Sequence, residues 1–272
     1  MELTYAGMTE GAVKIADTIR SDPEKASRMT ARELAEASGT GAATVIRYAK
    51  NLGYSGYEEM RDFLADSVRS GKRDDIEMTD KESLTQLKHK TVSFDSRFIK
   101  ETIGNIEEYQ LTEAADAIYH AEHVQIAAVG SAAGVAVAAV SIFNTFGIAA
   151  EHHMDDLQQC RAAARLKPGD VVIGINYSGS FRGIADTLSA AKESGAAVIL
   201  ITATKLGILS RYADITFLIP VRNYTNQLNI PASVLCQTAV IQMILFRMWQ
   251  LWPEELSLRA DHSGALTKKK TL

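Results

Sequence analysis

Apolar and polar positions follow two different patterns along this chain. Between Thr9 and Ser70 the apolar side chains recur at α-helical spacing, in a stretch rich in Ala, Glu and Arg. Between His123 and Pro220 short apolar runs alternate with helical stretches, which is typical of βαβ units and a parallel sheet. The expected strands are residues 123–129, 148–152, 171–176, 198–202 and 215–219. We therefore expect an α/β protein with a separate all-α domain: a helix-turn-helix bundle, then a doubly wound five-stranded parallel sheet.

A polar and highly charged stretch separates the two patterns. It begins at Gly71 and is typical of a linker with room for one amphipathic helix, whose sparse apolar positions are Ile76, Leu84, Leu87 and Val92. We expect a first domain over residues 1–73, a linker over 74–95, a sheet domain over 96–252 and a C-terminal tail over 253–272.

Composition narrows the class of protein. With 272 residues and 46% hydrophobic content the chain can bury a large core, and its two cysteines, Cys160 and Cys236, suit a reducing compartment. Residues 1–18 lack the basic start and apolar run of a signal peptide, and no stretch of about 18 apolar residues is evident. We expect a cytoplasmic protein with no membrane span. The net charge of −4 averages over both domains, so the charge of each has to be considered separately.

Two short helices stand close together in the first domain. Thr30 and Glu33 have the spacing of a capping box, residues 38–40 break the first helix, and a second helix is expected over residues 41–52. A turn that contains Gly between two such helices predicts a helix-turn-helix motif, whose second helix enters the major groove of DNA. Arg47 and Lys50 make this second helix basic, and no acid occurs between residues 40 and 57. The alternative is an ordinary helical bundle with solvated cations.

The same stretch resembles the N-terminal DNA-binding domain of the RpiR family of bacterial transcription regulators. The resemblance rests on Ile15-Ala-Asp-Thr-Ile19, Glu33-Leu-Ala35, Ala43-Thr-Val-Ile-Arg47, Leu52-Gly-Tyr54 and Gly56-Tyr-Glu-Glu-Met60. One departure is Gly41, where the family usually has a Ser cap, but Gly also caps helices adequately. The resemblance implies that Thr44, Arg47 and Lys50 face DNA and that the turn from Tyr54 to Tyr57 lies near phosphates.

Three loops of the sheet domain are expected to carry its function. In a doubly wound sheet ligands bind outside the carboxyl ends of the strands, which selects residues 130–134, 176–182 and 203–207. Gly130-Ser131 and Ser178-Gly-Ser180 each follow a strand and open a helix, where amides and hydroxyls favour an anion such as phosphate. Such turns also favour these residues for conformational reasons alone. The chain has neither the glycine pattern of dinucleotide-binding folds nor a Walker-type loop, so no cofactor is expected.

The second domain resembles the sugar isomerase (SIS) domain, the phosphosugar-binding module of RpiR regulators. The resemblance spans about residues 99–249 and rests on Val129-Gly130, Tyr177-Ser-Gly179, Leu200-Ile-Thr202 and Ala213-Asp214. Ala132, Phe181 and Gly207 stand where the family has hydroxyl groups, so Phe181 could fill part of the pocket. With the residue chemistry above, the expected ligand-binding residues are Gly130, Ser131, Ser178, Gly179, Ser180, Arg182, Thr202, Thr204 and Lys205.

A regulator is expected rather than an enzyme. His152, His153 and Asp155 are the obvious candidates for an isomerase base, but such residues before a helix more often cap it or face solvent, so we assign no catalytic residue and no metal site. We expect a homodimer or homotetramer on a palindromic double-stranded operator, because the apolar segment from Pro231 to Trp249 exceeds the needs of one contact face. The effector would be a phosphosugar or a related anion. The alternatives are a phosphosugar isomerase with a helical dimerisation domain, or a regulator that has lost phosphosugar binding.

Overall fold

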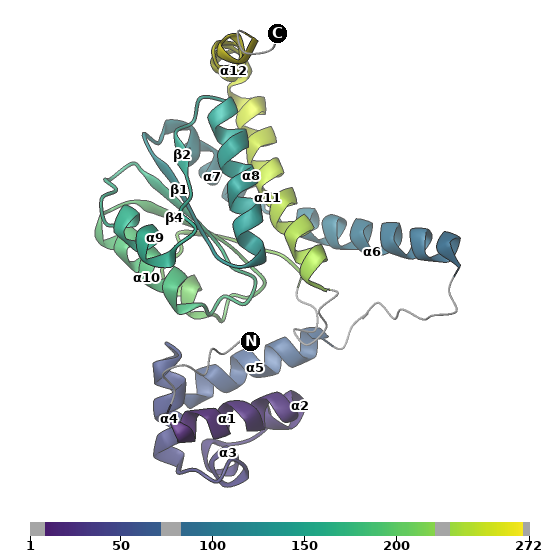
Figure 1. Cartoon of the computed structure of the whole chain (residues 1–272), viewed down its shortest axis with the longest axis vertical. Coiled ribbons are helices and arrows are strands. Elements are labelled where there is room, and N and C mark those ends of the chain that lie inside the picture. Colours follow the sequence, from purple (N-terminus) through teal and green to yellow (C-terminus); the bar gives the residue numbers. More distant parts are fainter. Residues whose placement is uncertain (1–8, 72–82, 221–228, 269–272) are drawn as a thin grey trace. The chain divides into compact units, whose positions relative to one another are not determined.

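The computed structural model describes residues 9–71, 83–220 and 229–268 of the chain. These residues divide into two compact units, one built on the first five helices and one on the sheet and the helices around it. Each unit is described by itself (Figure 1).

The N-terminal unit is entirely helical, as the apolar spacing predicts. Its helices are α1 (Glu10–Ser21), α2 (Pro23–Ala26), α3 (Ala31–Ala37), α4 (Ala42–Asn51) and α5 (Tyr57–Gly71). The inward-facing positions of the amphipathic helices build one core, because residues spaced three or four apart share a helix face. Its fully buried members include Ile15, Leu34, Val45 and Ala49.

The second unit contains a five-stranded parallel sheet in the order β2-β1-β3-β4-β5. The strands are β1 (Val124–Ala128), β2 (Ala150–Glu151), β3 (Val171–Ile175), β4 (Ala197–Thr202) and β5 (Ile215–Leu218). All five predicted strands are confirmed, and every residue of β1 and β3 is buried. The strand β2 is shorter than the predicted 148–152, because side chains rather than backbone continue the pairing beyond Glu151, as described below.

Helices cover both faces of this sheet. The helices α9 (Asp156–Ala163) and α10 (Arg182–Glu193) pack together on one face, and α7 (Glu108–His120), α8 (Ser131–Thr145) and α11 (Asn229–Leu251) lie on the other (Figure 1). A short 3₁₀ turn, Ile208–Arg211, connects β4 to β5. Since β1 has β2 on one side and β3 on the other, the chain reverses direction across the sheet at the β1/β3 boundary. Ligands of doubly wound folds bind at this boundary.

The helix α11 is long and apolar. Within the described residues, Ile230–Leu251 meets the length and composition of a membrane span, which corrects the expectation that no segment is so apolar. Of the most apolar 18-residue stretch of this helix, 44% is buried inside the unit. The Trp249 ring meets Phe146 at a centroid distance of 5.7 Å, and Arg247 donates hydrogen bonds to Thr112 of α7. These contacts are those of a core helix that packs on its neighbours.

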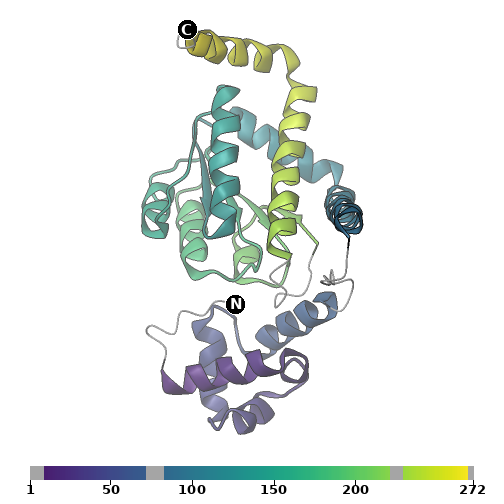
Figure 2. The same cartoon turned by 45° about the vertical axis from the view of Figure 1, so that its right-hand side comes forward.

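The helix expected in the linker is longer than predicted, and the segment expected to be a C-terminal tail is also a helix. The second half of the expected linker belongs to α6 (Leu84–Gly104), which Phe98 and Thr102 anchor in the core. The expected C-terminal tail forms α12 (Pro253–Lys268), which leaves the end of α11 at a steep angle (Figure 2). Its start is fixed by long-range contacts that spacing cannot reveal: Trp252 stacks on Tyr119 at 4.1 Å, and the Arg259 guanidinium lies 4.6 Å from the centre of the Tyr119 ring.

Candidate functional sites

The helix-turn-helix geometry depends on a capped helix and a tight turn. The Glu33 amide donates to Thr30 Oγ1 at 3.3 Å and the Thr30 amide donates to Glu33 Oε2 at 2.7 Å, which confirms the predicted capping box. The turn to α4 passes through Gly39 at φ +62°, a conformation that favours glycine. Ser38 and Thr40 share a hydrogen bond of 2.8 Å across this turn. The second helix is therefore held firmly against the first.

The outer face of α4 carries two cations and no acid. Val45, Tyr48 and Ala49 are buried, which places Arg47 and Lys50 on the exposed side of the helix. Neither cation takes part in an ion pair within the part of the chain that the structure describes. The exposed side of α4 thus offers uncommitted positive charge.

The Thr44 side chain is less exposed than those of Arg47 and Lys50. It is half-buried because its methyl group lies against Gly11 of α1, where an added Cβ would approach it to 3.1 Å. Gly41 caps α4 without a side-chain hydrogen bond, and its carbonyl accepts from the Thr44 amide at 2.8 Å.

Tyr54 and Tyr57 do not offer their side chains to a ligand. Tyr54 packs on Phe63 with ring centroids 5.7 Å apart, and the Tyr57 hydroxyl donates to the Met29 carbonyl at 2.7 Å. Both side chains are buried, and burial raises the pKa of Tyr57 above its ordinary value. The two side chains therefore anchor the turn in the core. The nearness of this turn to phosphate stays a prediction, and only its exposed backbone and neighbours could make that contact.

Two strand-to-helix turns meet at the β1/β3 boundary of the sheet unit. Gly130, at φ +62°, caps α8, and Ser131 is exposed at the first position of that helix. After β3, Ser180 Oγ lies 3.1 Å from Ser178 Oγ, and Ser178 Oγ donates to Asn176 Oδ1 at 3.1 Å. Gly179, at φ +65°, allows the tight turn that brings these hydroxyls together. Its amide donates to the Asn176 carbonyl at 3.3 Å, so it serves the turn itself.

The remaining predicted ligand residues fall into buried and exposed groups. Thr202 is fully buried with its hydroxyl 3.5 Å from the Tyr177 carbonyl, and Thr204 is 4% exposed, so neither side chain is open to solvent in this structure. Arg182 and Lys205 are exposed, and Arg182 lies 3.3 Å from Asp186 one turn along α10. Only these two bring positive charge to the loops.

Phe181 lies at the rim of the loops. It is the N-cap of α10, makes no capping hydrogen bond, and is 41% exposed. A Cβ added to Gly183 would collide with both the Phe181 ring and the Asp156 carboxylate, so the ring lies over the start of α10 beside α9. Ser178 and Ser180 themselves are half-buried.

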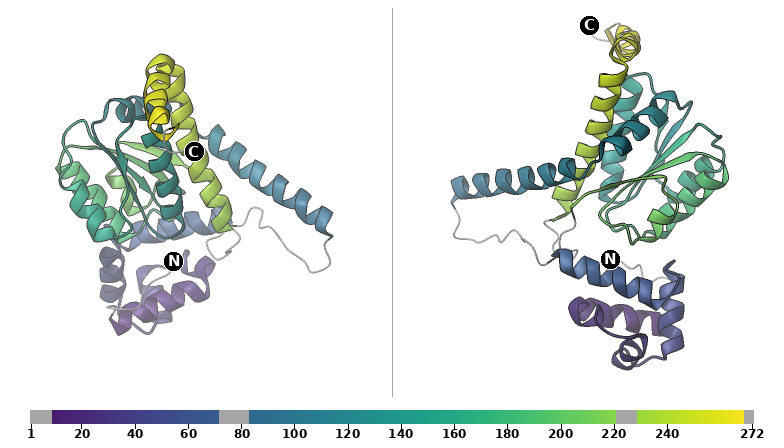
Figure 3. Two further views of the ribbon diagram at one scale, coloured as in Figure 1. Left: turned by 45° about the horizontal axis from the view of Figure 1, so that its top comes forward. Right: turned by 180° about the vertical axis from the view of Figure 1, so that it is seen from behind.

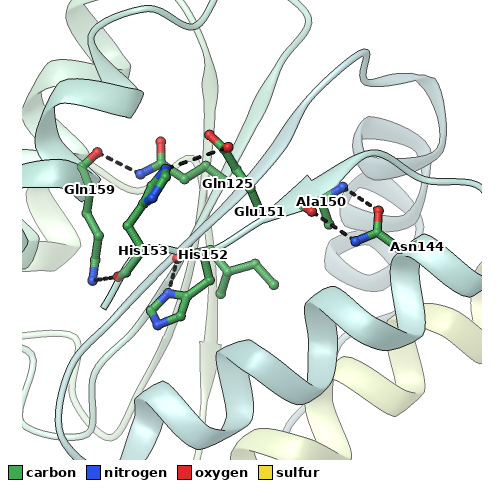
Figure 4. A network of polar contacts seen from close by, with 8 residues as sticks. Gln125, Asn144, Ala150, Glu151, His152, His153 and Gln159 are labelled. Atoms are coloured by element: carbon green, nitrogen blue, oxygen red, sulfur yellow. Dashed lines mark hydrogen bonds and ion pairs between the residues drawn. The ribbon is translucent and has the colours of Figure 1, made fainter. Parts of the chain in front are cut away.

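A buried polar network borders the same edge of the sheet, and sequence reasoning missed it (Figure 4). Gln159 Nε2 donates to the carbonyls of Ala128 and His153 at 2.8 and 2.7 Å, and Gln159 Oε1 accepts from the Ala128 amide at 3.1 Å. Gln125 Nε2 donates to the Gln159 carbonyl at 2.6 Å. The sequence offers one signal for this network: a glutamine, Gln125, in an otherwise apolar strand, and a second, Gln159, in a short helix.

The two histidines after β2 have different partners. His152 Nδ1 lies 2.9 Å from the Ile126 carbonyl, which can only accept, so Nδ1 carries the proton. His152 Nε2 is buried and has no hydrogen-bond partner among the described residues. His153 Nε2 lies 3.6 Å from Glu151 instead. His152 therefore has one buried ring nitrogen without a hydrogen-bond partner among the described residues, close to the end of β1.

Family profiles match both units. The helix-turn-helix domain of the rpiR family matches residues 1–71, and the SIS domain matches residues 117–247. A curated relative from Caldanaerobacter subterraneus, named as an uncharacterized HTH-type transcriptional regulator, is 28% identical over 90% of this chain and 87% of its own. The HTH-type transcriptional regulator HexR of Pseudomonas aeruginosa is 26% identical over 70% of this chain and 67% of its own.

Solved structures share the fold. The NanR protein of Vibrio vulnificus, complexed with ManNAc-6P, aligns with a TM-score of 0.66 at 18% identity over 98% of this chain and 96% of its own. The sugar isomerase domain of an RpiR transcription factor from Sphaerobacter thermophilus aligns with a TM-score of 0.59 at 22% identity, over 66% of this chain and 99% of its own.

Proposed function

Because the chain belongs to the rpiR family of helix-turn-helix transcription regulators, we propose that its SIS domain senses a phosphorylated sugar and modulates the binding of α4 to an operator. The chain is a regulator and not an enzyme. Within this frame α4 enters the major groove with Arg47 and Lys50, and the loops after β1 and β3 hold the effector.

The convergence of two helix N-termini at the β1/β3 boundary carries this proposal. The starts of α8 and α10 follow neighbouring strands, and each has amides without a side-chain cap. A helix N-terminus attracts anions through its free amides and its dipole. The Ser178 and Ser180 hydroxyls add donors at the same place, so a phosphate group suits the site. The relative complexed with ManNAc-6P supports a phosphorylated hexose derivative as the effector class.

We also propose that the protein acts in the cytoplasm as a homodimer on a palindromic operator. A single helix-turn-helix buries little surface on DNA, whereas a two-fold pair reads two half-sites about one helical turn apart. The exposed apolar side chains of the sheet unit provide surface for such a pair, among them Ile103, Leu235, Phe246 and Trp249.

The test is a binding assay in two stages. In a thermal-shift assay ManNAc-6P and other hexose 6-phosphates should raise the melting temperature, while the unphosphorylated sugars should not, because a ligand of the native state stabilises it. Fluorescence anisotropy with DNA selected from a random library then measures operator affinity with and without the stabilising sugar phosphate. An affinity that no phosphosugar changes would leave a DNA-binding protein whose SIS domain has lost effector binding.

A further inference from the structure

The exposed face of α4 combines cations with apolar side chains. Ile46, Arg47 and Lys50 lie three, four and seven residues after Ala43, so the four side chains share one face of the helix, and all four are exposed. Figures 1 and 3 show α4 at the outer edge of the N-terminal unit, with the other helices on its opposite side. Within its unit this face is therefore uncovered.

Ile46 is an unusual member of this face. Its side chain is 41% exposed, and among the described side chains of residues 9–71 it is the only large apolar one that is exposed. Scattered exposed apolar side chains are common on proteins, but Ile46 lies one helical turn from Lys50 and next to Arg47, on the helix that is proposed to enter the major groove. It therefore offers an apolar contact on a face that is otherwise positively charged.

The side chains of α4 restrict which bases it can read. Residues 42–50 contain no Asn, Gln, Asp or Glu, the side chains that recognise adenine or cytosine by hydrogen bonds, and Thr44 is half-buried against α1. Arg47 supplies the fork of donors that fits guanine. The apolar group that bases present in the major groove is the C5-methyl group of thymine, which apolar side chains contact. Guanine and thymine are thus the bases that this helix face can recognise.

The start of α4 allows a close approach to DNA. Helix-turn-helix proteins contact base edges with the first residues of the second helix. Gly41, Ala42 and Ala43 have no side-chain atoms beyond Cβ, so no side chain at this end holds the backbone away from the bases. Ile46, one turn further along, is then the first exposed aliphatic side chain long enough to meet them, whereas Asn51 lies at the opposite end of the helix.

We propose that Ile46 contacts the C5-methyl group of a thymine in each operator half-site, in addition to the guanine that Arg47 reads. This contact rests on the proposed function, because it requires α4 to lie in the major groove. Ile46 and Arg47 belong to the same turn of α4, which places the thymine and the guanine in one half-site. Burial of the methyl group against an aliphatic side chain should raise the affinity about fourfold per half-site.

The test removes the methyl group from the DNA as well as the side chain from the protein. Deoxyuridine pairs as thymidine does and differs from it only in lacking the C5-methyl group. In the operator selected from the random library, each thymine position is changed in turn to deoxyuridine, in both half-sites together, and anisotropy measures the affinity of the full chain. The parent should lose about fourfold or more per half-site at one position. Ile46→Ala should bind the thymine operator more weakly and show no such loss at that position.

Two further variants serve as controls. Ile46→Val keeps an aliphatic contact and should retain most of the dependence on the methyl group, and Leu258→Ala, which truncates a 70% exposed side chain on α12, should bind both operators as the parent does. Equal affinity of the parent for thymine and deoxyuridine at every position would overturn the contact, and so would a loss that persists in Ile46→Ala. In both cases specific binding to the selected operator would leave the proposed function intact. A parent that prefers no DNA sequence would overturn the proposed function as well.

Discussion

The side-chain amide of Gln159 pairs with the backbone of Ala128 as a neighbouring peptide group would. Its Nε2 donates to the Ala128 carbonyl at 2.8 Å and its Oε1 accepts from the Ala128 amide at 3.1 Å. The pairing of β1 with β2 reaches only Gln125 and Glu151, and His152 Nδ1 takes the Ile126 carbonyl beyond it. Side chains thus complete the hydrogen bonds of β1 where the backbone of β2 turns away.

Replacing Gln159 should therefore destabilise the sheet unit. Gln159→Leu keeps most of the volume but leaves the Ala128 amide and carbonyl buried and unsatisfied, which costs about 1–3 kcal/mol per group. We expect a clear drop in the urea midpoint at unchanged slope. Gln158→Leu on the exposed side of the same helix is the matched control and should stay close to the parent. Equal midpoints for both variants would contradict this role of Gln159.

DNA binding should depend differently on the two cations of α4. Arg47→Ala should lose about 1–3 kcal/mol on the preferred operator and relax its sequence preference, if the guanidinium reads a base edge. Lys50→Ala should weaken all sequences alike and flatten the dependence of the logarithm of affinity on salt, as loss of a phosphate contact does. Salt-titrated anisotropy measures both. The control is Lys25→Ala, which removes an exposed cation from α2; if it weakens binding as much, the assignment to α4 is wrong.

The effector loop allows a paired test at Ser178 and Phe181. Ser178→Ala interrupts the hydroxyl chain from Ser180 to Asn176 and should remove about 0.5–1.5 kcal/mol of phosphosugar affinity and most of the DNA-binding response. Phe181→Thr restores a hydroxyl at the N-cap of α10 and should strengthen binding in calorimetry.

Phe181→Ala separates the two effects of that change, because it clears volume without adding a donor. Ser189→Ala, on the exposed side of α10, serves as the control for Ser178. If neither the parent nor Phe181→Thr binds any phosphorylated sugar, the sheet unit senses another metabolite or serves only for assembly.

Acid should loosen the helix-turn-helix through Glu33. The hydrogen bond from the Thr30 amide, followed by that from the Thr30 hydroxyl, lowers the pKa of Glu33 below its ordinary value of 4.5. A carboxylate with a lowered folded-state pKa contributes stability that is present above its unfolded pKa and lost as pH falls through the folded value. Glu33→Gln does not titrate, so between pH 6 and pH 3 it should lose less stability than the parent in urea titrations. Glu36→Gln on the same helix should behave as the parent does.

The sequence predicts elements better than it predicts contacts. Apolar runs locate β1 and β3 to within two residues, because a strand buried on both faces has to be apolar throughout. The early end of β2 was not predictable, since it depends on Gln159, which lies eight residues beyond Glu151 and reaches back to β1. The full extent of α6 and the presence of α12 were not predicted for a related reason: the contacts that hold them, the burial of Phe98 and the Arg259 contact with Tyr119, are tertiary.

The candidate sites divide in the same way. Helical spacing alone places Arg47 and Lys50 on an exposed face, because Val45 and Tyr48 fix the inward one. It does not place Tyr57, whose hydroxyl finds a carbonyl 28 residues earlier in the chain. Strand ends locate the Ser178 turn, yet no spacing argument reveals that one ring nitrogen of His152 is hydrogen-bonded while the other has no partner in the part of the chain that the structure describes.

The two-residue length of β2 also bears on how the protein behaves at high concentration. An outer strand with open amides and carbonyls offers a template to which foreign strands can add, and natural sheets shorten or obstruct such edges. In this sheet the outer strand stops after Glu151, and the groups of β1 that it leaves uncovered are occupied by an imidazole and a carboxamide. These backbone groups of β1 are therefore not open to pairing with a strand of a second chain. This side of the sheet is protected against strand addition and the aggregation that follows from it.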